Sequence, residues 1–274
     1  MTEKLLMCTP EGFSVSYEIN PWMRNQIGCV DPKLAASQWQ RLYDTLAPMA
    51  RIELMQGDAQ WPDLVFTANA GLPLAGQKKF ILSNFRHPQR RGEKPIDRAW
   101  FERAGWRCIE LPQQVIFEGA GDALFDSDGN LWLGSGPRSD SSTLTHLARH
   151  IDASIFALRL VSSEYYHLDT CFCPLANGYA LCMPHAFDEA SQHLLRQRFG
   201  DRLIELTADE GLQFCANAVC IGENVVMNRT TPRLAALLGD LGFTLFETPL
   251  SEFMKSGGGA KCLTLCIEGS LLGA

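Results

Sequence analysis

The chain has 274 residues, of which 46% are hydrophobic and 20% charged, as in ordinary soluble globular proteins. Its formal net charge of −7 argues against nucleic acid as a partner, because binding phosphate requires an excess of Lys and Arg on one face. No apolar run approaches the roughly 18–20 residues of a membrane-spanning helix, and residues 1–13 lack the features of a signal peptide. We therefore expect no membrane partner and a cytoplasmic protein whose ten cysteines stay reduced.

Short apolar runs that predict buried strands alternate along the chain with segments of helical periodicity. Strands are predicted at 26–29, 64–67, 80–82, 115–117, 130–133, 155–160, 179–183, 218–221 and 263–267, and helices at 32–50, 95–104, 141–149, 190–199 and 232–241. Gly, Pro, Asn and Asp separate roughly five strand–helix groups of about 50 residues each. This spacing fits a doubly wound sheet or a radial array of small sheets, and periodicity alone does not choose between them. Length leaves one large domain or two smaller ones open.

The first polar segment, residues 61–71, carries Asp63 and Asn69 at the two ends of the predicted strand 64–67. Their even spacing of six would place both side chains on one side of an extended strand. The alternative is that both are turn formers that cap a strand.

The second polar segment follows the predicted strand 115–117 and places Gly119 and Gly121 between Glu118 and Asp122. Glycines let the backbone bend sharply enough to bring both carboxylates toward one point. Paired carboxylates suit a metal ion or a guanidinium group, and an acidic surface turn is the alternative.

In the third segment, His167 is followed two positions later by Asp169, which is close enough to orient or charge the imidazole of a general acid–base. Cys171 and Cys173 lie just beyond, so a His–Cys metal cluster is an alternative, although no second pair of ligands has suitable spacing.

Two loops carry arginines that could bind a substrate carboxylate in bidentate fashion. Arg138 lies in the Gly- and Ser-rich turn 134–139, and Arg86 begins the less specific basic run 86–91. The alternative for each is an arginine in a solvated loop.

The most informative segment is 256–265, in which three consecutive glycines precede Lys261 and Cys262 at the start of an apolar run. Ordering three glycines is costly and is typical of places where backbone approaches a ligand closely. The spacing does not match a phosphate-binding P-loop. A structural cysteine after a glycine turn is the alternative.

Together these residues describe covalent catalysis at a cationic carbon, with Cys262 as nucleophile and His167 as the proton-transfer group. Glu118 and Asp63 would bind a guanidinium group and Arg138 an α-carboxylate, without a metal or organic cofactor. A cation about 4 Å away stabilises a thiolate by ~4 kcal/mol at an effective dielectric of ~20, but by only ~1 kcal/mol in bulk water. Activation of the thiol by the substrate therefore requires a dry pocket.

The motifs Asp63-x-Val-Phe-x-x-Asn69, Phe117-Glu118-Gly119-x-Gly121-Asp122, His167-Leu168-Asp169-Thr170 and Gly257-Gly258-Gly259-x-Lys261-Cys262-Leu263 resemble those of the guanidine-modifying enzymes. That superfamily includes dimethylarginine dimethylaminohydrolase, arginine deiminase and the amidinotransferases. The resemblance covers essentially the whole chain and implies one domain over residues 1–274, an α/β propeller of five blades (pentein) with fivefold pseudosymmetry. It also implies a catalytic set of Cys262, His167 and Glu118.

One position departs from the pattern of the hydrolases and deiminases, because Asn69 replaces the second acid of the first motif. This looks like the arginine dihydrolase branch, which converts arginine to ornithine, carbon dioxide and two ammonia molecules through citrulline. An amide can donate a hydrogen bond to the neutral ureido oxygen of citrulline, whereas a carboxylate only accepts. We therefore expect Asn69 to retain citrulline for a second attack.

Three alternatives stay open: a hydrolase that stops at citrulline, acting on arginine or methylated arginine; an amidinotransferase; and an inactive member that serves as a binding protein. The sequence leaves open whether the protein forms a homo-oligomer, and whether Asp122 and Asp169 contact substrate or orient their neighbours.

Overall fold

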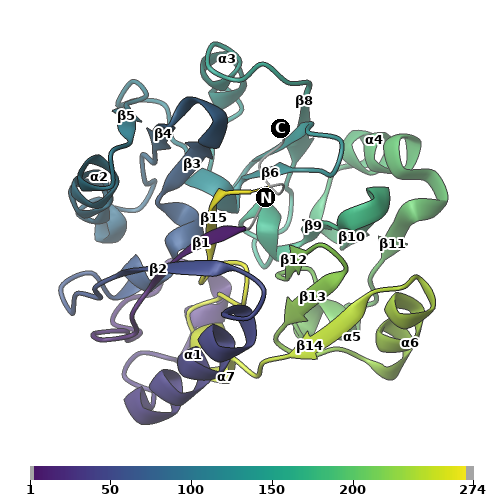
Figure 1. Cartoon of the computed structure of the whole chain (residues 1–274), viewed down its shortest axis with the longest axis horizontal. Helices are drawn as coiled ribbons and strands as arrows, with labels where there is room; N and C mark the ends of the chain where they lie inside the picture. The colour runs from purple at the N-terminus through teal and green to yellow at the C-terminus, as the bar shows by residue number, and fades with distance from the viewer. Residues whose placement is uncertain (1–2, 270–274) are drawn as a thin grey trace.

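The computed structural model describes residues 3–269, and within them five three-stranded sheets surround a common centre (Figure 1). The sheet orders are β15-β1-β2, β3-β4-β5, β6-β7-β8, β11-β10-β9 and β12-β13-β14. The strands are β1 (Lys4–Cys8), β2 (Arg51–Met55), β3 (Gly71–Leu74), β4 (Lys79–Leu82), β5 (Arg107–Ile109), β6 (Ala123–Phe125), β7 (Leu131–Ser135), β8 (Ile155–Arg159), β9 (Phe172–Pro174), β10 (Ala180–Cys182), β11 (Leu203–Glu205), β12 (Val219–Ile221), β13 (Asn224–Met227), β14 (Thr244–Glu247) and β15 (Leu265–Glu268). The predicted α/β fold of five blades is confirmed.

Every sheet repeats one unit, in which a first strand pairs antiparallel with a middle strand and the middle strand pairs parallel with an outer one. A parallel pair needs a crossover, and a helix supplies it each time. The crossover helices are α1 (Pro32–Leu46), α2 (Glu93–Arg103), α3 (Thr143–Leu147), α4 (Glu189–Phe199) and α6 (Pro232–Asp240), while α5 (Ala208–Leu212) and α7 (Ser251–Met254) lie in connections. The sheet β15-β1-β2 joins strands from both ends of the chain.

The five crossover helices correspond to the five predicted ones, and three of them, α1, α4 and α6, begin with a side-chain cap. The Asp31 side chain accepts hydrogen bonds from the backbone N–H groups of Lys33 and Leu34 at the start of α1, and Pro32 occupies the first helical position. Thr231 caps α6 in the same way, ahead of Pro232.

Three predicted strands are wrong. Residues 26–29 form a turn in which Gly28 has a φ of +72°, and residues 64–67 fall in two consecutive 3-10 turns, Pro62–Val65 and Thr67–Asn69. Residues 115–117 supply only an isolated bridge between Phe117 and Asn84. The apolar residues of 64–67 are buried in the core, and a short buried turn has the same apolar pattern as a short buried strand.

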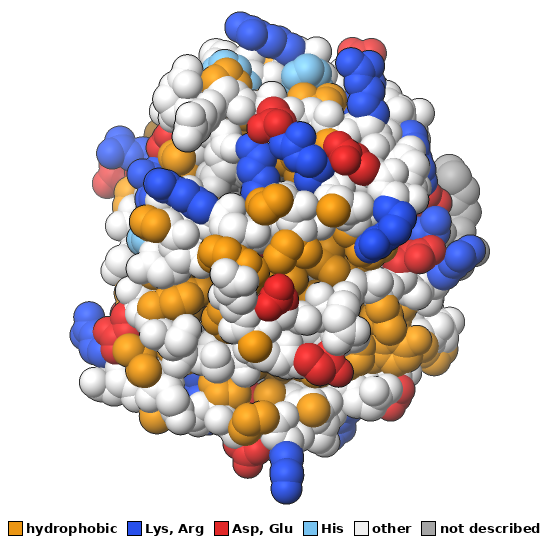
Figure 2. Space-filling view, turned by 90° about the vertical axis from the view of Figure 1, so that its left-hand side faces the viewer, with side chains coloured by type: hydrophobic (Ala, Val, Ile, Leu, Met, Phe, Trp, Pro, Cys, Tyr) orange, Lys and Arg blue, Asp and Glu red, His pale blue; other side chains and the backbone are white. Residues whose placement is uncertain are grey.

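Hydrophobic side chains also reach the outer surface, in the middle of the face that carries α2 and β2, with charged side chains around them (Figure 2). A cleft of about 640 Å³ lies there between β2 and α2, lined by Leu54, Ile96 and Trp100 among others. None of the nine predicted site residues lines this cleft.

A short turn precedes the first strand of every sheet, and four of these five turns carry polar residues singled out from the sequence. The turn residues and their strands are Asn69 before β3, Glu118 to Asp122 before β6, His167 to Asp169 before β9, Asn217 before β12 and Cys262 before β15. Because the five sheets are arranged around one centre, the five turns meet there (Figure 1).

Candidate active site

Hydrogen bonds tie the five inner turns to one another. The Ala68 N–H donates to the carbonyl oxygen of Cys262 at 3.2 Å, and Asn69 Nδ2 donates to the carbonyl oxygen of Glu118 at 3.3 Å. The Glu118 carboxylate in turn lies 2.8 Å from His167 Nε2. Side chains from three separate sheets are thereby held at fixed positions.

Asn217, which was not predicted from the sequence, links the turn before β12 to the turns that carry Asp169 and Cys262. Its Nδ2 donates to the carbonyl oxygen of Asp169 at 2.9 Å and to the Sγ of Cys262 at 3.1 Å. Its Oδ1 accepts from the backbone N–H groups of Gly259 and Cys262 at 3.0 and 3.2 Å. One amide thus fixes both the glycine loop and the thiol that follows it.

Cys262 is buried, and its thiol donates to Oδ2 of Asp169 at 3.4 Å. Burial and the adjacent Asp169 raise the pKa of Cys262 well above its ordinary value, so the thiol is neutral before substrate binds. Burial also raises the pKa of Asp169 to about 7, although Lys261 lowers it. The neutral thiol therefore lies within hydrogen-bond distance of a carboxyl group whose own pKa is raised.

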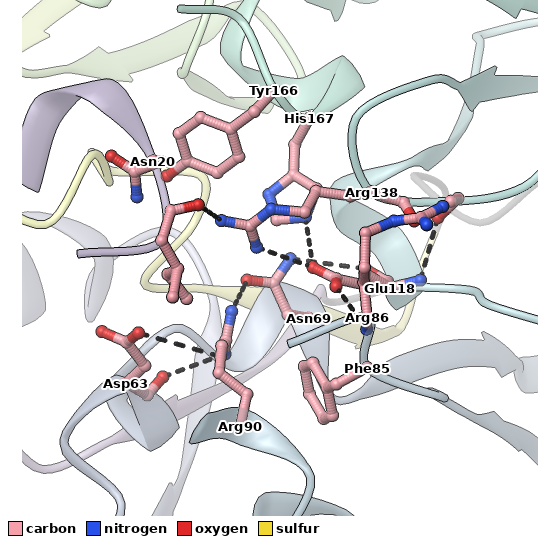
Figure 3. Close-up of polar contacts among 12 residues, drawn as sticks. Asn20, Asp63, Asn69, Phe85, Arg86, Arg90, Glu118, Arg138, Tyr166 and His167 are labelled. Carbon is pink, nitrogen blue, oxygen red and sulfur yellow. Dashed lines mark hydrogen bonds and ion pairs between the residues drawn. The ribbon is translucent and has the colours of Figure 1, made fainter. Parts of the chain in front are cut away.

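Glu118 is completely buried and binds two groups through the same oxygen, Oε2: His167 Nε2 at 2.8 Å and Arg138 Nη1 at 2.9 Å (Figure 3). Burial alone would raise the pKa of Glu118, but Arg138 and then His167 lower it well below its ordinary value. Because Glu118 stays ionised, His167 Nε2 donates the proton of this contact. This contact uses Nε2 and leaves the other ring nitrogen, Nδ1, outside it.

Arg138 makes two further contacts in the site. Its Nη2 donates to the carbonyl oxygen of Ile19 at 3.1 Å, and its guanidinium lies 4.6 Å from the centre of the Tyr166 ring (Figure 3). The Tyr166 hydroxyl donates to the carbonyl oxygen of Gly257 at 2.6 Å, which joins this arginine to the glycine loop.

Asp63 and Asn69 meet at Arg90, although no strand connects them. Arg90 Nη1 donates to Oδ1 of Asn69 at 2.8 Å, and its Nη2 donates to the carbonyl oxygen of Asp63 at 3.1 Å (Figure 3). The Asp63 carboxylate accepts from the hydroxyls of Tyr17 and Ser256, each at 2.9 Å. The turn between the two residues, rather than strand alternation, brings both to the same place.

The side chain of Arg86, predicted to bind substrate, lies outside this group. Its Nη2 pairs with Asp140 at 2.6 Å and its Nε donates to the carbonyl oxygen of Arg138 at 2.9 Å, while only its backbone N–H reaches the Glu118 carboxylate. The basic run 86–91 does contribute an arginine to the site, but it is Arg90. The 3-10 turn Pro88–Arg90 turns that side chain inward, which the basic composition of the run does not reveal.

Asp122 is buried next to the site without touching either arginine. Its Oδ2 accepts from Ser139 Oγ at 2.6 Å and its Oδ1 from the Leu168 N–H at 3.0 Å, so it positions the turn that begins with His167. Burial raises the pKa of Asp122 to about 6, although His167, Ser139 and the Leu168 N–H lower it.

The thiols of the two cysteines after Asp169 contact backbone carbonyl oxygens and not the imidazole of His167. The Cys171 thiol donates to backbone carbonyls at 3.4 and 3.7 Å and the Cys173 thiol to the carbonyl oxygen of Ala218 at 3.5 Å. In residues 3–269 no group of three or more His, Cys, Asp or Glu side chains is arranged to hold a metal ion. The geometry does not support the His–Cys cluster.

The site encloses a cavity of about 10 Å³, enough for about one water molecule. Its walls are Ile19, Asn20, Asp63, Phe66, Asn69, Arg90, Arg138, Tyr166, Ser256, Gly258 and Cys262. A Cβ on Gly258 would lie 2.2 Å from the Phe66 ring, so this position has no room for a side chain. The cavity is small and most of its walls are buried, as activation of a thiol by a cationic substrate requires.

A buried cysteine, histidine and glutamate at the centre of five β-sheets, beside carboxylates and arginines, define the class of guanidine-modifying enzymes. The family described as N,N dimethylarginine dimethylhydrolase, eukaryotic, matches residues 31–268, and the chain belongs to this family.

The chain is 43% identical over 271 residues to the bifunctional arginine dihydrolase/ornithine cyclodeaminase ArgZ of Synechocystis, covering 98% of this chain and 38% of ArgZ. It is also 33% identical to the N(G),N(G)-dimethylarginine dimethylaminohydrolase of Mycobacterium tuberculosis, covering 97% of this chain and 86% of that protein. A crystal structure of the N-terminal domain of ArgZ from cyanobacteria, a cysteine-to-serine mutant bound to substrate, superposes with a TM-score of 0.95 at 42% identity and covers 97% of this chain and 98% of that one. The chain thus spans less than half the length of ArgZ and nearly all of its solved N-terminal domain.

No helix within residues 3–269 is both long and apolar enough to cross a membrane.

Proposed function

We propose that the chain is an arginine dihydrolase, which uses Cys262 to hydrolyse the guanidinium group of L-arginine twice. The observation that carries the proposal is the convergence of Cys262, Asp63, Asn69 and Arg138 on one closed cavity. The likeness to ArgZ, itself described as an arginine dihydrolase, supports the substrate.

In this proposal the substrate displaces Arg138 from Glu118. The cavity is too small for arginine, and Arg138 is held there by one ion pair and one backbone carbonyl. The substrate guanidinium replaces that of Arg138 on Glu118 and binds Asp63, and Arg138 turns to the substrate α-carboxylate, for which its planar fork is suited.

The first hydrolysis begins when the substrate cation lies beside Cys262. The cation lowers the thiol pKa, and Asp169, already within hydrogen-bond distance, accepts the proton. The thiolate attacks the guanidinium carbon, His167, protonated on both ring nitrogens at this stage, gives its Nδ1 proton to the departing ammonia, and the neutral imidazole then takes a proton from a water molecule. The resulting hydroxide attacks the covalent intermediate, the carbon–sulfur bond breaks, the departing thiolate takes back the proton from Asp169, and citrulline forms when its ureido oxygen loses a proton to solvent.

The second hydrolysis requires citrulline to stay bound, and we assign this task to Asn69. An amide donates to the ureido oxygen, whereas aspartate would repel it. Over both rounds arginine and two water molecules give ornithine, carbon dioxide and two ammonia molecules.

The proposal is tested by an end-point assay with L-arginine that quantifies ornithine, citrulline and ammonia, with Cys262→Ser as control. Ornithine with two ammonia per arginine, absent in the variant, is the expected result. Citrulline as the final product would identify a deiminase, and turnover of dimethylarginine alone would identify the activity named by the family. Amidino transfer to glycine or lysine would identify an amidinotransferase.

We further propose that the enzyme acts in the cytoplasm as a single domain over residues 1–274. All ten cysteines are free thiols, which supports a reducing compartment. The sequence leaves open whether the chain forms a homo-oligomer, and sedimentation of the purified chain decides it.

A further inference from the structure

We infer that the buried pair of Arg90 and Glu93 fixes the orientation of the Asn69 amide, and that this orientation determines whether citrulline is kept for the second hydrolysis. The inference rests on the proposed dihydrolase function and adds two positioning residues that lie behind Asn69.

Two hydrogen bonds to Glu93 hold the Arg90 guanidinium in place. Its Nε and Nη2 donate to the two carboxylate oxygens of Glu93 at 2.8 and 2.7 Å, and both side chains are almost completely buried. This two-pronged contact leaves Nη1 to donate to Oδ1 of Asn69 at 2.8 Å. The negative charge of Glu93 also balances the positive charge of Arg90. Arg138 is therefore the arginine better able to bind a substrate carboxylate.

The two contacts of Asn69 permit only one orientation of its amide. Oδ1 faces Arg90, which can only donate, and Nδ2 faces the carbonyl oxygen of Glu118, which can only accept (Figure 3). A flipped amide would oppose donor to donor and acceptor to acceptor. Arg90 therefore fixes which end of the amide points toward the catalytic residues.

That end is the donor. A Cβ built on Gly121 would lie 2.3 Å from Asn69 Nδ2 and 3.5 Å from Cγ of His167, so the amide nitrogen and the imidazole lie on the same side of the Gly121 backbone. Asn69 lines the same cavity as Cys262, and Glu118 accepts only one of the two Nδ2 hydrogens, so the other can be donated to an oxygen on a carbon bound at Cys262. A guanidinium offers no such oxygen, whereas citrulline does, so a fixed donor favours the intermediate product over the first substrate.

A different role for Arg90, direct binding of the substrate carboxylate, predicts a different result. Loss of carboxylate binding weakens the binding of arginine and citrulline together, so KM for arginine would rise along with citrulline release, whereas loss of amide orientation leaves KM for arginine nearly unchanged; KM for arginine is therefore measured alongside the product ratio. Loss of amide orientation lets citrulline escape, because the fixed donor no longer meets the ureido oxygen.

The experiment measures the ratio of ornithine to released citrulline during turnover of L-arginine by the whole chain. Arg90→Lys keeps the charge but cannot bind both Glu93 and Asn69. The matched control is Arg233→Lys, because Arg233 also binds a buried carboxylate, Glu210, through Nε and Nη2 but lies on α6. We expect the ratio to fall at least tenfold in Arg90→Lys and to stay at the wild-type value in Arg233→Lys.

Combining Arg90→Lys with Asn69→Asp tests whether Arg90 acts through the orientation of the Asn69 amide. A carboxylate has no donor end to orient, so adding Arg90→Lys to Asn69→Asp should lower the ratio no further. An unchanged ratio in Arg90→Lys, or the same further loss in the Asn69→Asp background, would overturn the inference.

If Arg90→Lys does not fold, Glu93→Gln takes its place. A smaller decrease in the ratio is then expected, because only one of the two hydrogen bonds between Arg90 and residue 93 is lost. A wild-type enzyme that stops at citrulline would overturn the dihydrolase function, whereas ornithine production that is insensitive to these changes overturns the inference alone.

Discussion

Two buried arginines line the same cavity, and each is paired with a buried glutamate in a different way. Arg138 contacts Glu118 through one nitrogen, shares that carboxylate oxygen with His167, and rests on a backbone carbonyl and an aromatic ring. Arg90 binds both oxygens of Glu93 and donates to two further acceptors. In the proposed mechanism the first pair exchanges partners with the incoming guanidinium, whereas the second, held by more hydrogen bonds, keeps Arg90 in place.

The largest effect is expected from Glu118→Gln, in the exchangeable pair. The change removes the charge that would hold both the substrate guanidinium and the His167 ring, so we expect kcat/KM for arginine to fall by roughly 10³-fold. Steady-state ammonia release measures it, with the thermal melting curve confirming that the variant is folded. A loss below tenfold would show that Glu118 is not at the reacting centre.

Arg138→Lys tests the other member of the exchangeable pair. A lysine cannot form the bidentate contact with a carboxylate, so we expect KM for arginine to rise by roughly 10–100-fold with little change in kcat. Agmatine, which is arginine without its carboxylate, serves as the matched substrate, and its turnover should not change. Equal losses on both substrates would contradict a role in carboxylate binding.

Glu93→Gln tests the supporting pair through stability. Removing one partner of a buried pair leaves the Arg90 charge poorly compensated, so the free energy of unfolding should fall by on the order of 3 kcal/mol. The control is Glu205→Gln, which breaks an exposed pair with Arg196 and should cost less than about 1 kcal/mol. Denaturant unfolding measures the free energy of unfolding of both variants. Similar losses would show that Glu93 stabilises the fold no more than a partner in an exposed pair does.

Asp122→Asn extends the comparison to a buried carboxyl that neither arginine touches. Burial raises its pKa from 3.8 to about 6, so the folded protein binds an additional proton between these values. A raised carboxyl pKa contributes stability that is fully present below about 3.8 and is lost as the pH rises through about 6. We expect the stability of the wild type relative to Asp122→Asn to decrease by on the order of 2–3 kcal/mol from pH ~4 to pH ~7. Denaturant unfolding at several pH values measures this, and parallel curves would contradict it.

The sequence was sufficient for the repeated unit of the fold and for most of the residues that the structure brings together. Helix starts such as Asp31-Pro32 and Thr231-Pro232 depend on local chemistry, so the five crossover helices could be predicted. Glu118, His167, Asp169 and Cys262 could be named because their residue types and glycine neighbours conform to a known family pattern.

Only the tertiary structure could decide which residues of the loops face inward. Arg86 and Arg90 belong to the same basic run, and a single 3-10 turn sends one to Asp140 and the other to Asn69. The sequence around Asn217 carries no distinctive motif. The position of Asn217 in the site depends on its contacts with Asp169 and Cys262, which lie 48 and 45 positions away. Sequence periodicity indicates which side chains of a helix or strand lie on its buried face. The direction of a turn, and the partner it meets, depend on how five separate sheets pack around one centre.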